Sequence, residues 1–321
     1  MSPLTRLFSF CAHLWKKARL IPVYKKEDEA DTNNYRPISL VSVPRKIMES
    51  CVTDTIVGHV LHNNLVTDKQ WAYREGHSTE LLLVHLSEIW RRSIDEDKVV
   101  AVAFVDFRKA FDCVSHAILL HKLKFQFGVQ GPLLSWLTDY LSDRTQFSVV
   151  NDQHSTVLNV TCGIPQGSVL SPTLFALYTN VLPNSVSSGT VFMYADDTTV
   201  YCIGDTVDSA VTPLNRALSE MNRWCRENSP LGKVRSNVID EKTGPLNSVI
   251  IGEDRIEWVK HTRLLGVTID DRLSWLKHLT DVKTEPLKEN FVPKKGRPIG
   301  FVFSGYPTLS SIWSCRVGWM R

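Results

Sequence analysis

The 321-residue chain lacks the features that would mark it as a membrane or secreted protein. No apolar run reaches the ~18 residues that a membrane-spanning helix needs. Residues 7–14 are too short, and too interrupted by Ser, Cys and His, for a signal peptide. The seven cysteines include no CxxC pair and lie far apart, at positions 11, 51, 113, 162, 202, 225 and 315. Such a pattern argues against a disulfide framework, so we expect a soluble protein of a reducing intracellular compartment without a membrane partner.

A strong charge imbalance is also missing, since the net charge is only +3 and charged residues make up 22%. The charges are unevenly distributed, with 9 Lys or Arg against 5 Asp or Glu in residues 1–50 and 7 against 3 in residues 281–321. A basic arm before a slightly acidic body suits a protein that holds phosphates at one wall and metal-binding carboxylates at another. An apolar content of 43% is enough to build two or three subdomains.

A structural zinc site is not indicated either. The nearest group of ligand types is Cys113, His116 and His121. These residues lie where a strand gives way to a helix, and no fourth ligand is close in sequence, so ordinary packing is the better interpretation.

Apolar periodicity predicts a chain that starts mainly helical, after a basic extended entry. Residues 44–66 and 81–94 have helical spacing. The β-branched run 99–105 is continuously apolar, as in a strand buried on both faces. A helix is expected over 115–127, where Gly128 closes it. Further helices are expected at 132–141 and 172–182, and a hairpin from strands 146–150 and 157–161.

The second half predicts a hairpin, one long helix and several short strands. The β-prone runs 190–194 and 198–202 flank Ala195, Asp196 and Asp197, which we place at the hairpin tip. An amphipathic helix is predicted to open at Thr212-Pro213 and to end at Asn228. Short strands follow at 248–251, 255–259 and 264–269, and the tail from about 281 is assigned no fold. The pattern is mixed α+β with an antiparallel sheet.

Three aspartates are the candidates for chemistry. Asp106 ends the buried strand, and Asp196 and Asp197 occupy the hairpin tip. If those strands are neighbours, three carboxylates meet at one edge of the sheet. Magnesium prefers such oxygen ligands, and phosphoryl transfer uses two divalent ions about 4 Å apart. Each of these pieces alone is better explained as a turn, so the case depends on the ordered set of motifs.

Three segments form that ordered set. They read FVDFRKAFDC at 104–113, GIPQGSVLSP at 163–172 and MYADDT at 193–198. In this order they closely resemble the central palm motifs of the reverse transcriptases carried by non-LTR (LINE-like) retrotransposons. The resemblance covers roughly residues 15–280 and extends to segments 18–26, 34–40, 70–79, 264–270 and 273–275.

The resemblance implies a right-hand polymerase of α+β class, whose palm is an antiparallel sheet packed on helices. Fingers would occupy 1–98, with 120–160 as a further candidate segment, and the palm 99–280. The tail 281–321 diverges from the family, so the thumb is expected to be absent, degenerate or frame-changed. The implied activity is an RNA-directed DNA polymerase that joins deoxynucleotides to a primer 3′-hydroxyl with two Mg²⁺ or Mn²⁺ ions. Its implied partners are an RNA template, a DNA primer and dNTPs.

The same resemblance assigns roles to individual residues. Asp106 and Asp196 would be metal ligands, with Asp197 as the third carboxylate of the catalytic site. Phe111 would pack under the nucleotide sugar and exclude a 2′-hydroxyl. Further nucleotide-binding candidates are Phe107, Gln166, Gly167, Arg36 and Lys25. Template or primer candidates are Tyr194, Arg74 and Tyr73. Trp71 and Tyr73 could stack on template bases, and core packing explains both aromatics equally well.

Residues 229–245 depart from the family, which has there a strand carrying a lysine thought to protonate the departing pyrophosphate. Lys233 and Lys242 are both candidates for that role, and spacing does not choose between them. Little sequence precedes the fingers, which leaves no room for an endonuclease and suggests a truncated copy. The first alternative function is therefore an inactive remnant that at most binds nucleic acid. A two-metal nuclease ranks lower, because it has no use for Phe111 or the 163–167 loop.

Overall fold

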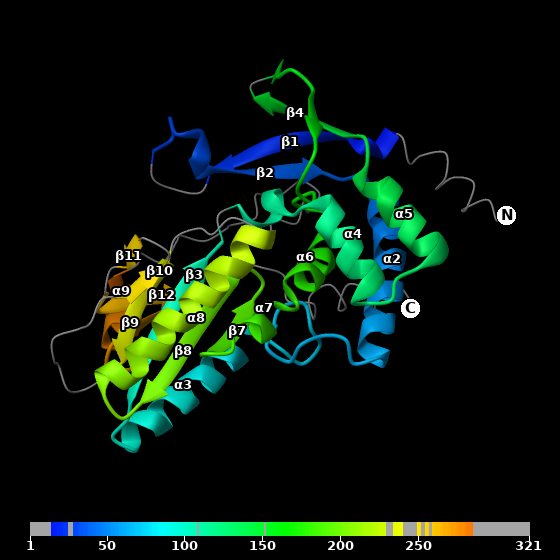
Figure 1. Ribbon diagram of the computed structural model, residues 1–321. Coiled ribbons are helices and arrows are strands. Elements are labelled where there is room, and N and C mark those ends of the chain that lie inside the picture. Colours follow the sequence, from blue (N-terminus) through cyan, green and yellow to red (C-terminus); the bar gives the residue numbers. More distant parts are fainter. Residues whose placement is uncertain are drawn as a thin grey trace, which may run out of the picture. The chain divides into compact units, whose positions relative to one another are not determined.

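The structure is a computed structural model that describes residues 14–24, 28–107, 109–150, 152–228, 234–239, 249–251, 254–256 and 259–284. These residues form two compact units, each assembled from segments far apart in sequence (Figure 1). The described part of unit 1 comprises residues up to Asp68, Phe107–Leu182 and residues 224–228. Unit 2 comprises Lys69–Asp106, Pro183–Arg223 and the described residues from 234 onward. The expected boundaries of fingers (1–98) and palm (99–280) stay a prediction.

Unit 2 is built on a four-stranded antiparallel sheet in the order β7-β8-β3-β9. Its central strand β3 is buried along its whole length except for the last residue, Asp106. A strand with neighbours on both sides and apolar residues on both faces must be covered by other elements on each face. The strands of the sheet are β3 (Val99–Asp106), β7 (Thr190–Tyr194), β8 (Asp197–Gly204) and β9 (Val234–Ile239).

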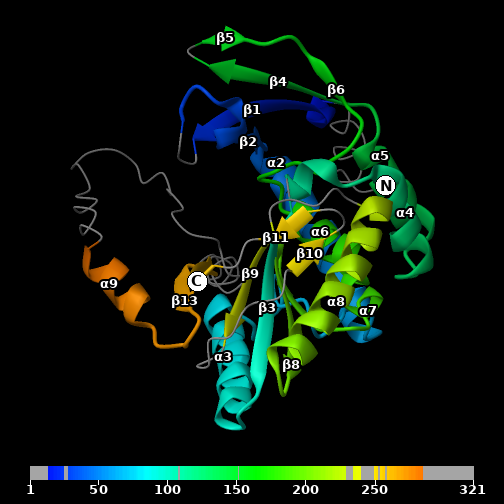
Figure 2. The same ribbon diagram turned by 60° about the vertical axis from the view of Figure 1, so that its left-hand side comes forward.

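Two helices, α3 (Thr79–Asp95) and α8 (Val207–Asn228), cover the two faces of this sheet (Figure 2). Successive side chains of a strand alternate between faces. Val100, Val102 and Phe104 point to the α3 side, where they pack in one cluster with Leu86 and Trp90. On the other side, Ala101 and Ala103 are fully buried, as are the α8 residues Leu214, Ala217 and Leu218. The predicted strand 99–105 and helix 81–94 are therefore confirmed.

The start of α8 was predicted wrongly. The helix begins at Val207, so Pro213 lies inside it. Thr206 and Ser209 form a reciprocal cap in which the amide of Ser209 donates to Thr206 Oγ1 at 3.2 Å and the amide of Thr206 donates to Ser209 Oγ at 2.9 Å. This cap satisfies amides that a helix start leaves without partners, and it outweighs the preference of proline for a first turn. The predicted end at Asn228 is confirmed.

The remaining described residues of unit 2 include two small hairpins and a helix. The single strand expected over 264–269 was wrong, because Leu265 and Gly266 adopt positive φ of 48° and 88° and turn the chain back. Two successive residues of positive φ make the tight turn that matches the twist of a hairpin. The elements are β10 (Val249–Ile251), β11 (Asp254–Ile256), β12 (His261–Leu264), β13 (Val267–Asp270) and α9 (Leu276–Thr284).

Unit 1 combines a second sheet, in the order β2-β1-β4-β5 with β6 beside β4, with four helices. The basic entry is not a free arm, because β1 pairs with β2 on one side and, in parallel, with β4 on the other. Long-range pairing of this kind leaves little trace in local sequence. The strands are β1 (Lys17–Tyr24), β2 (Tyr35–Leu40), β4 (Arg144–Val150), β5 (Gln153–His154) and β6 (Leu158–Val160).

The helices of unit 1 lie close to where periodicity placed them. Leu119, Leu137, Leu174 and Ile56, one from each helix, are fully buried and form part of the core. Short turns of 3₁₀ helix, η1 (Leu14–Lys16), η2 (Thr32–Asn34) and η3 (Ala110–Cys113), and the single turn α7 (Leu182–Ser185) connect larger elements. The helices are α2 (Val43–His62), α4 (His116–Phe125), α5 (Gly131–Leu141) and α6 (Ser171–Thr179).

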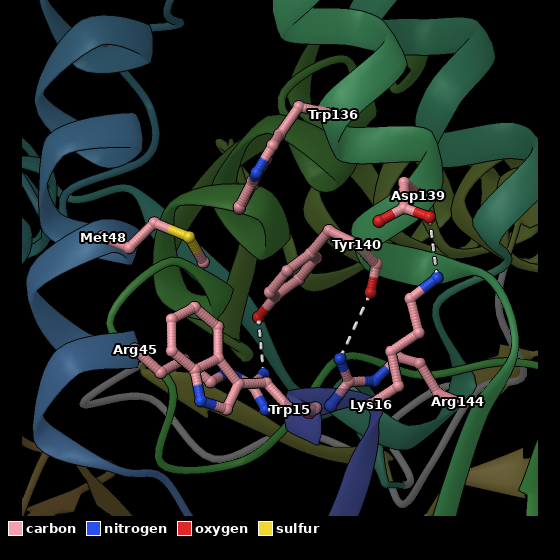
Figure 3. A pocket seen from close by; sticks show the side chains of 8 residues that line it. All are labelled: Trp15, Lys16, Arg45, Met48, Trp136, Asp139, Tyr140 and Arg144. Carbon is pink, nitrogen blue, oxygen red and sulfur yellow. Dashed lines mark hydrogen bonds and ion pairs between the residues drawn. The ribbon is translucent and has the colours of Figure 1, made fainter. Parts of the chain in front are cut away.

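A small cavity lies within unit 1 among η1, α2 and α5 (Figure 3). Its volume of about 20 Å³ leaves room for about one water molecule, so it is a packing gap and not a ligand pocket. Arg45 and Tyr140 are hydrogen bonded at its rim, as are Lys16 and Asp139. None of the described helices combines the length and the apolar character that crossing a lipid bilayer requires.

Candidate active site

The backbone of unit 2 brings the three predicted carboxylates to one edge of the sheet. In the antiparallel register of β3 and β8, Asp106 is the direct partner of Asp197. Directly paired residues of such strands have Cβ atoms about 5 Å apart. Asp196 lies in the turn immediately before β8, and the exposed side chains of Asp106 and Asp197 contrast with the buried strands that carry them. The expectation that the strands of the three aspartates are neighbours is therefore met.

The turn that carries Asp196 is unusual in being buried and left-handed. Ala195 has a φ of 57° and is only 8% exposed. A residue with a side chain adopts this conformation at a cost of about 1–2 kcal/mol. Both polar groups of the Ala195 backbone bind the side chain of Gln70, the amide N–H at 3.0 Å and the carbonyl at 3.3 Å. The turn beside the candidate metal ligands is thus held by one side chain from a distant segment.

These oxygen donors fit a divalent metal ion that is completed by its substrate. Among the described residues, no three His, Cys, Asp or Glu side chains are grouped tightly enough to hold an ion by themselves. Magnesium is commonly bound by one or two carboxylates while phosphates and water supply the other ligands. The exposed carboxylates of Asp106 and Asp197 leave space for such ligands, and with the half-buried Asp196 of the adjoining turn they are the residues that would hold the ions.

In unit 1, the loop between β6 and α6 carries two glycines that no other residue could replace without strain. Gly163 has a φ of 88°, and a Cβ added there would lie 2.8 Å from the carbonyl oxygen of Asp112. Gly167 has a φ of 98°, and its added Cβ would lie 3.0 Å from the carbonyl oxygen of Ser39. The amide of Ser39 also donates to the carbonyl of Gln166 at 2.8 Å. These contacts fix the backbone of the loop on both sides of Gln166.

The side chains of Phe111 and Gln166 belong to one connected group in unit 1. The Phe111 ring is half-buried and stacks on Phe175 with 4.8 Å between ring centroids. Gln166 Nε2 donates to Asp112 Oδ1 at 2.8 Å, and the amide of Ile164 donates to the carbonyl of Phe111 at 2.8 Å. The structure therefore brings the predicted sugar-facing and amide-bearing residues together, through a carboxylate that sequence reasoning did not single out.

The buried ion pair of Arg45 and Glu49 is hydrogen bonded to the residues that follow this loop. Glu49 is fully buried and accepts hydrogen bonds from Arg45 Nε at 2.7 Å, Tyr140 Oη at 3.0 Å, Ser168 Oγ at 2.7 Å and the Val169 amide at 2.8 Å. Burial alone would lower the pKa of Arg45, but Tyr140 and Glu49 reverse the shift and the net pKa is raised. Burial and the charge of Glu49 raise the pKa of Tyr140. The guanidinium and the phenol therefore keep their protons, and the network stays intact at neutral pH.

The remaining nucleotide-binding candidates differ in their exposure to solvent, and some lie outside the described residues. Phe107 is 4% exposed, which leaves its backbone as the part that could face a ligand. Arg36 is exposed on β2, opposite Val23 of β1. Lys25, Lys233 and Lys242 lie outside the described residues. The structure therefore leaves the choice of a general acid open.

The template candidates all belong to unit 2. Tyr194 is half-buried, and burial followed by the charge of Glu80 raises its pKa. Arg74 and Tyr73 are half-buried, and Tyr73 has a positive φ of 61°. Trp71 stacks on His85 at 5.4 Å and meets Phe192 edge-on at 6.5 Å, so its ring is part of the packing. These contacts support the packing interpretation of Trp71, and its stacking on a template base stays a prediction.

The residues that sequence reasoning missed are Gln70, Asp112 and Glu49. Each acts on a backbone or side chain far away in sequence: Gln70 on Ala195, Asp112 on Gln166, and Glu49 on Ser168. The only local signal was the position of Gln70 and Asp112 inside segments already recognised as motifs. Glu49 stands four residues after Arg45 on a helix, a spacing that indicates an ion pair but not its buried position.

Comparison with known proteins places this geometry in context. The chain matches the family described as "Reverse transcriptase (RNA-dependent DNA polymerase)" over residues 23–269. It is 27% identical over 278 residues to the Drosophila melanogaster "Probable RNA-directed DNA polymerase from transposon BS", covering 83% of this chain and 30% of that protein. It is 29% identical over 280 residues to the "Probable RNA-directed DNA polymerase from transposon X-element" of the same organism, covering 84% and 30%. The chain thus spans about 30% of the length of these relatives.

A solved structure shares the fold. The "Structure of apo telomerase from Candida Tropicalis truncated from C-terminal domain" aligns with a TM-score of 0.53 and 11% identity, over 80% of this chain and 54% of that chain. At this identity the likeness concerns the fold alone. It agrees with the α+β architecture expected from the sequence.

Proposed function

Because the chain belongs to the reverse transcriptase (RNA-dependent DNA polymerase) family, we propose that it catalyses RNA-templated DNA synthesis with Asp106, Asp196 and Asp197 at the catalytic centre. The expected relation to the reverse transcriptases of non-LTR retrotransposons is confirmed by its relatives. The observation that carries the proposal is the strand register, which makes Asp106 and Asp197 direct partners beside the turn that bears Asp196. Carboxylates at the end of a rigid sheet are well suited to hold ions in a fixed place.

In this mechanism the three carboxylates bind two Mg²⁺ or Mn²⁺ ions from one side while the substrate phosphates bind them from the other. The ions would supply charge neutralisation at the attacking and leaving oxygens. The protein contributes position: the exposed aspartates face solvent, and the paired strands that carry them are almost fully buried and cannot move far. Since little covalent chemistry falls to the protein, correct placement accounts for most of its contribution.

The candidates of unit 1 would bind the incoming nucleotide. Phe111 would limit the space at the sugar 2′ position, because its ring is fixed by stacking on Phe175. Gln166 and the backbone of Gly167, whose positive φ suits a glycine, would contact the base or sugar. One N–H of the Gln166 side chain already donates to Asp112. Arg36 and Lys25 would neutralise the triphosphate.

The proposed partners are an RNA template, a DNA primer and deoxynucleoside triphosphates. Tyr194, Tyr73 and Arg74 are the residues of unit 2 proposed to contact template or primer. The described cysteines form no disulfide bond with one another, in keeping with the proposed reducing intracellular compartment.

The inactive-remnant alternative gains no support from the described residues. The carboxylates keep their register, and Gly163 and Gly167 keep the positive φ that their loop requires. A two-metal nuclease would use the same carboxylates but would not need the ordered group of Phe111, Gln166 and Asp112. The polymerase therefore remains the better explanation of the candidate residues that the two units carry.

Primer extension on an RNA template tests the proposal. We expect the native chain to extend a DNA primer with dNTPs and Mg²⁺, and Asp106→Asn and Asp196→Asn to lose at least ~100-fold in rate, since each removes a metal-binding charge. Asp152→Asn is the matched control, because Asp152 is an exposed turn residue with a φ of 60° that asparagine also tolerates. Folded native protein that extends no primer, or equal rates in all four proteins, would refute the proposal.

A further inference from the structure

We propose that Gln70 is a positioning residue that holds the turn carrying the catalytic aspartates. It does so through three hydrogen bonds from one fully buried amide. Gln70 Oε1 accepts from the amides of Ala195 at 3.0 Å and Ala72 at 3.1 Å, and Nε2 donates to the carbonyl of Ala195 at 3.3 Å. Gln70 itself is 1% exposed. This inference rests on the proposed function, because it assigns Gln70 a role in placing Asp196 and Asp197.

The side-chain amide of Gln70 meets both needs of the Ala195 backbone. The Ala195 N–H requires an acceptor and the Ala195 carbonyl requires a donor, and a glutamine offers one of each on the two atoms bonded to its Cδ. The orientation of the amide follows from this chemistry, since both backbone groups bound to Oε1 are donors. An ionised carboxylate would satisfy the two N–H groups but would repel the carbonyl, and an apolar side chain would satisfy neither.

The turn needs such a partner because of where it lies. The tip of a hairpin is usually exposed, so water binds its backbone groups. Ala195 is instead buried and left-handed, and a buried backbone group without a partner is strongly unfavourable. Gln70 therefore replaces water at the tip, in a conformation that alanine would otherwise seldom adopt.

Gln70 is itself held rigidly against the hairpin. The carbonyl of Lys69 accepts from the amide of Met193 at 2.9 Å, and the amide of Trp71 donates to the carbonyl of Met193 at 2.8 Å. The residues on both sides of Gln70 are thus bonded to the edge of β7, two residues before the turn. The backbone on either side of Gln70 binds Met193 and its side chain binds Ala195, so the segment contacts the hairpin at two positions. This leaves Asp196 and Asp197 little freedom to move.

This arrangement predicts a defect in metal use when the amide is lost. Gln70→Met keeps the length of the side chain and removes all three hydrogen bonds. We expect kcat to fall by about 10- to 100-fold, because a displacement of about 1 Å at reacting groups can cost that much. We also expect the Mg²⁺ concentration for half-maximal rate to rise several-fold while the KM for dNTP stays within about twofold. Gln153→Met, at an exposed position in β5, is the control.

Gln70→Glu gives a second variant with its own signature. When the introduced carboxyl is protonated it has an acceptor and a donor, like the amide, and when ionised it repels the Ala195 carbonyl. Burial favours the protonated form. Its rate relative to the native enzyme should therefore rise as the pH falls from about 8 to 6, which a purely structural defect would not produce. A Gln70→Glu variant with a pH profile parallel to that of the native enzyme would overturn the proposal.

Amide hydrogen exchange of the full chain separates this inference from the proposed function. The Ala195 amide should be protected in the native protein and exchange much faster in Gln70→Met, while the amides of α8 exchange at unchanged rates. Native protein without polymerase activity but with this pattern would reject the polymerase and retain the Gln70 contact. Active native protein whose Ala195 amide exchanges equally in both variants would reject the role of Gln70 and retain the polymerase. A Gln70→Met variant that is folded and has native kcat and Mg²⁺ dependence would also reject it.

Discussion

Replacement of Glu49 by alanine is the perturbation whose cost follows most directly from the contacts seen. The carboxylate accepts hydrogen bonds from four donors, and its strongest partner is the Arg45 guanidinium. The Arg45 and Glu49 side chains are 4% and 0% exposed. Water therefore cannot replace the lost acceptor, and the alanine variant leaves a buried cation without its counter-ion.

The expected loss of unfolding free energy is about 3–5 kcal/mol, the usual cost of removing one partner of a buried ion pair. A domain of this kind has a total stability of about 5–15 kcal/mol, so unit 1 would lose a large share of its stability. Removing both charges should cost less, because no buried charge remains. We therefore expect Arg45→Met/Glu49→Met to be more stable than Glu49→Ala by about 2 kcal/mol or more.

Urea-induced unfolding followed by tryptophan fluorescence measures these differences. Trp136 lies in unit 1 at the wall of the small cavity beside Arg45, so its emission should report on this network (Figure 3). Arg45→Met and Glu49→Met as single variants complete a double-mutant cycle with Arg45→Met/Glu49→Met, which isolates the coupling of the pair. A double variant that loses the sum of the two single losses would contradict the reasoning, because the charges would then contribute independently.

Two further predictions concern unit 1. Gly163→Ala should lose about 2 kcal/mol or more of unfolding free energy, because its Cβ would lie 2.8 Å from the Asp112 carbonyl oxygen at a positive φ. The control Gly76→Ala also has a positive φ but nothing within 4 Å of the added Cβ, and it should lose only about 1 kcal/mol. Equal losses of the two variants in thermal unfolding would show that the contact with Asp112 does not add to the cost. Burial lowers the pKa of Lys122 from 10.5 to about 8, so the unfolded chain binds the extra proton between these values and stability should rise by up to about 3 kcal/mol from pH 8 to 10.5. The same measurement on Lys122→Met should lack that rise, and parallel stability curves for the two proteins would refute the lowered pKa.

Much of the fold could be predicted from local pattern. The apolar run of β3 and the helical periods of α2 to α6 were confirmed, because residues that must be buried repeat with the period of the element that buries them. The start of α8 and the β12–β13 turn were missed. At the start of α8, the Thr206–Ser209 cap outweighed the preference of proline for the first turn of a helix. In β12–β13, the positive φ of Leu265 and Gly266 outweighed the alternation that predicts one continuous strand.

The candidate site, like the fold, could be predicted from the sequence only in part. Asp106, Asp196 and Asp197 could be named in advance because their motifs are short and contiguous, and the register then proved compatible with a shared site. Their supporting residues could not. Gln70 and Ala195 are 125 residues apart in sequence, and nothing near Gln70 indicates that its amide is needed by a distant turn.

The sequence by itself determined which residues are the candidates for the chemistry and where most of the strands and helices lie, because side-chain type and periodicity are local properties. The tertiary structure decided what holds those residues in place. Backbone groups of a buried turn and a buried carboxylate must find partners wherever the folded chain provides them, and that pairing exists only once Gln70 meets Ala195 and Glu49 meets Ser168.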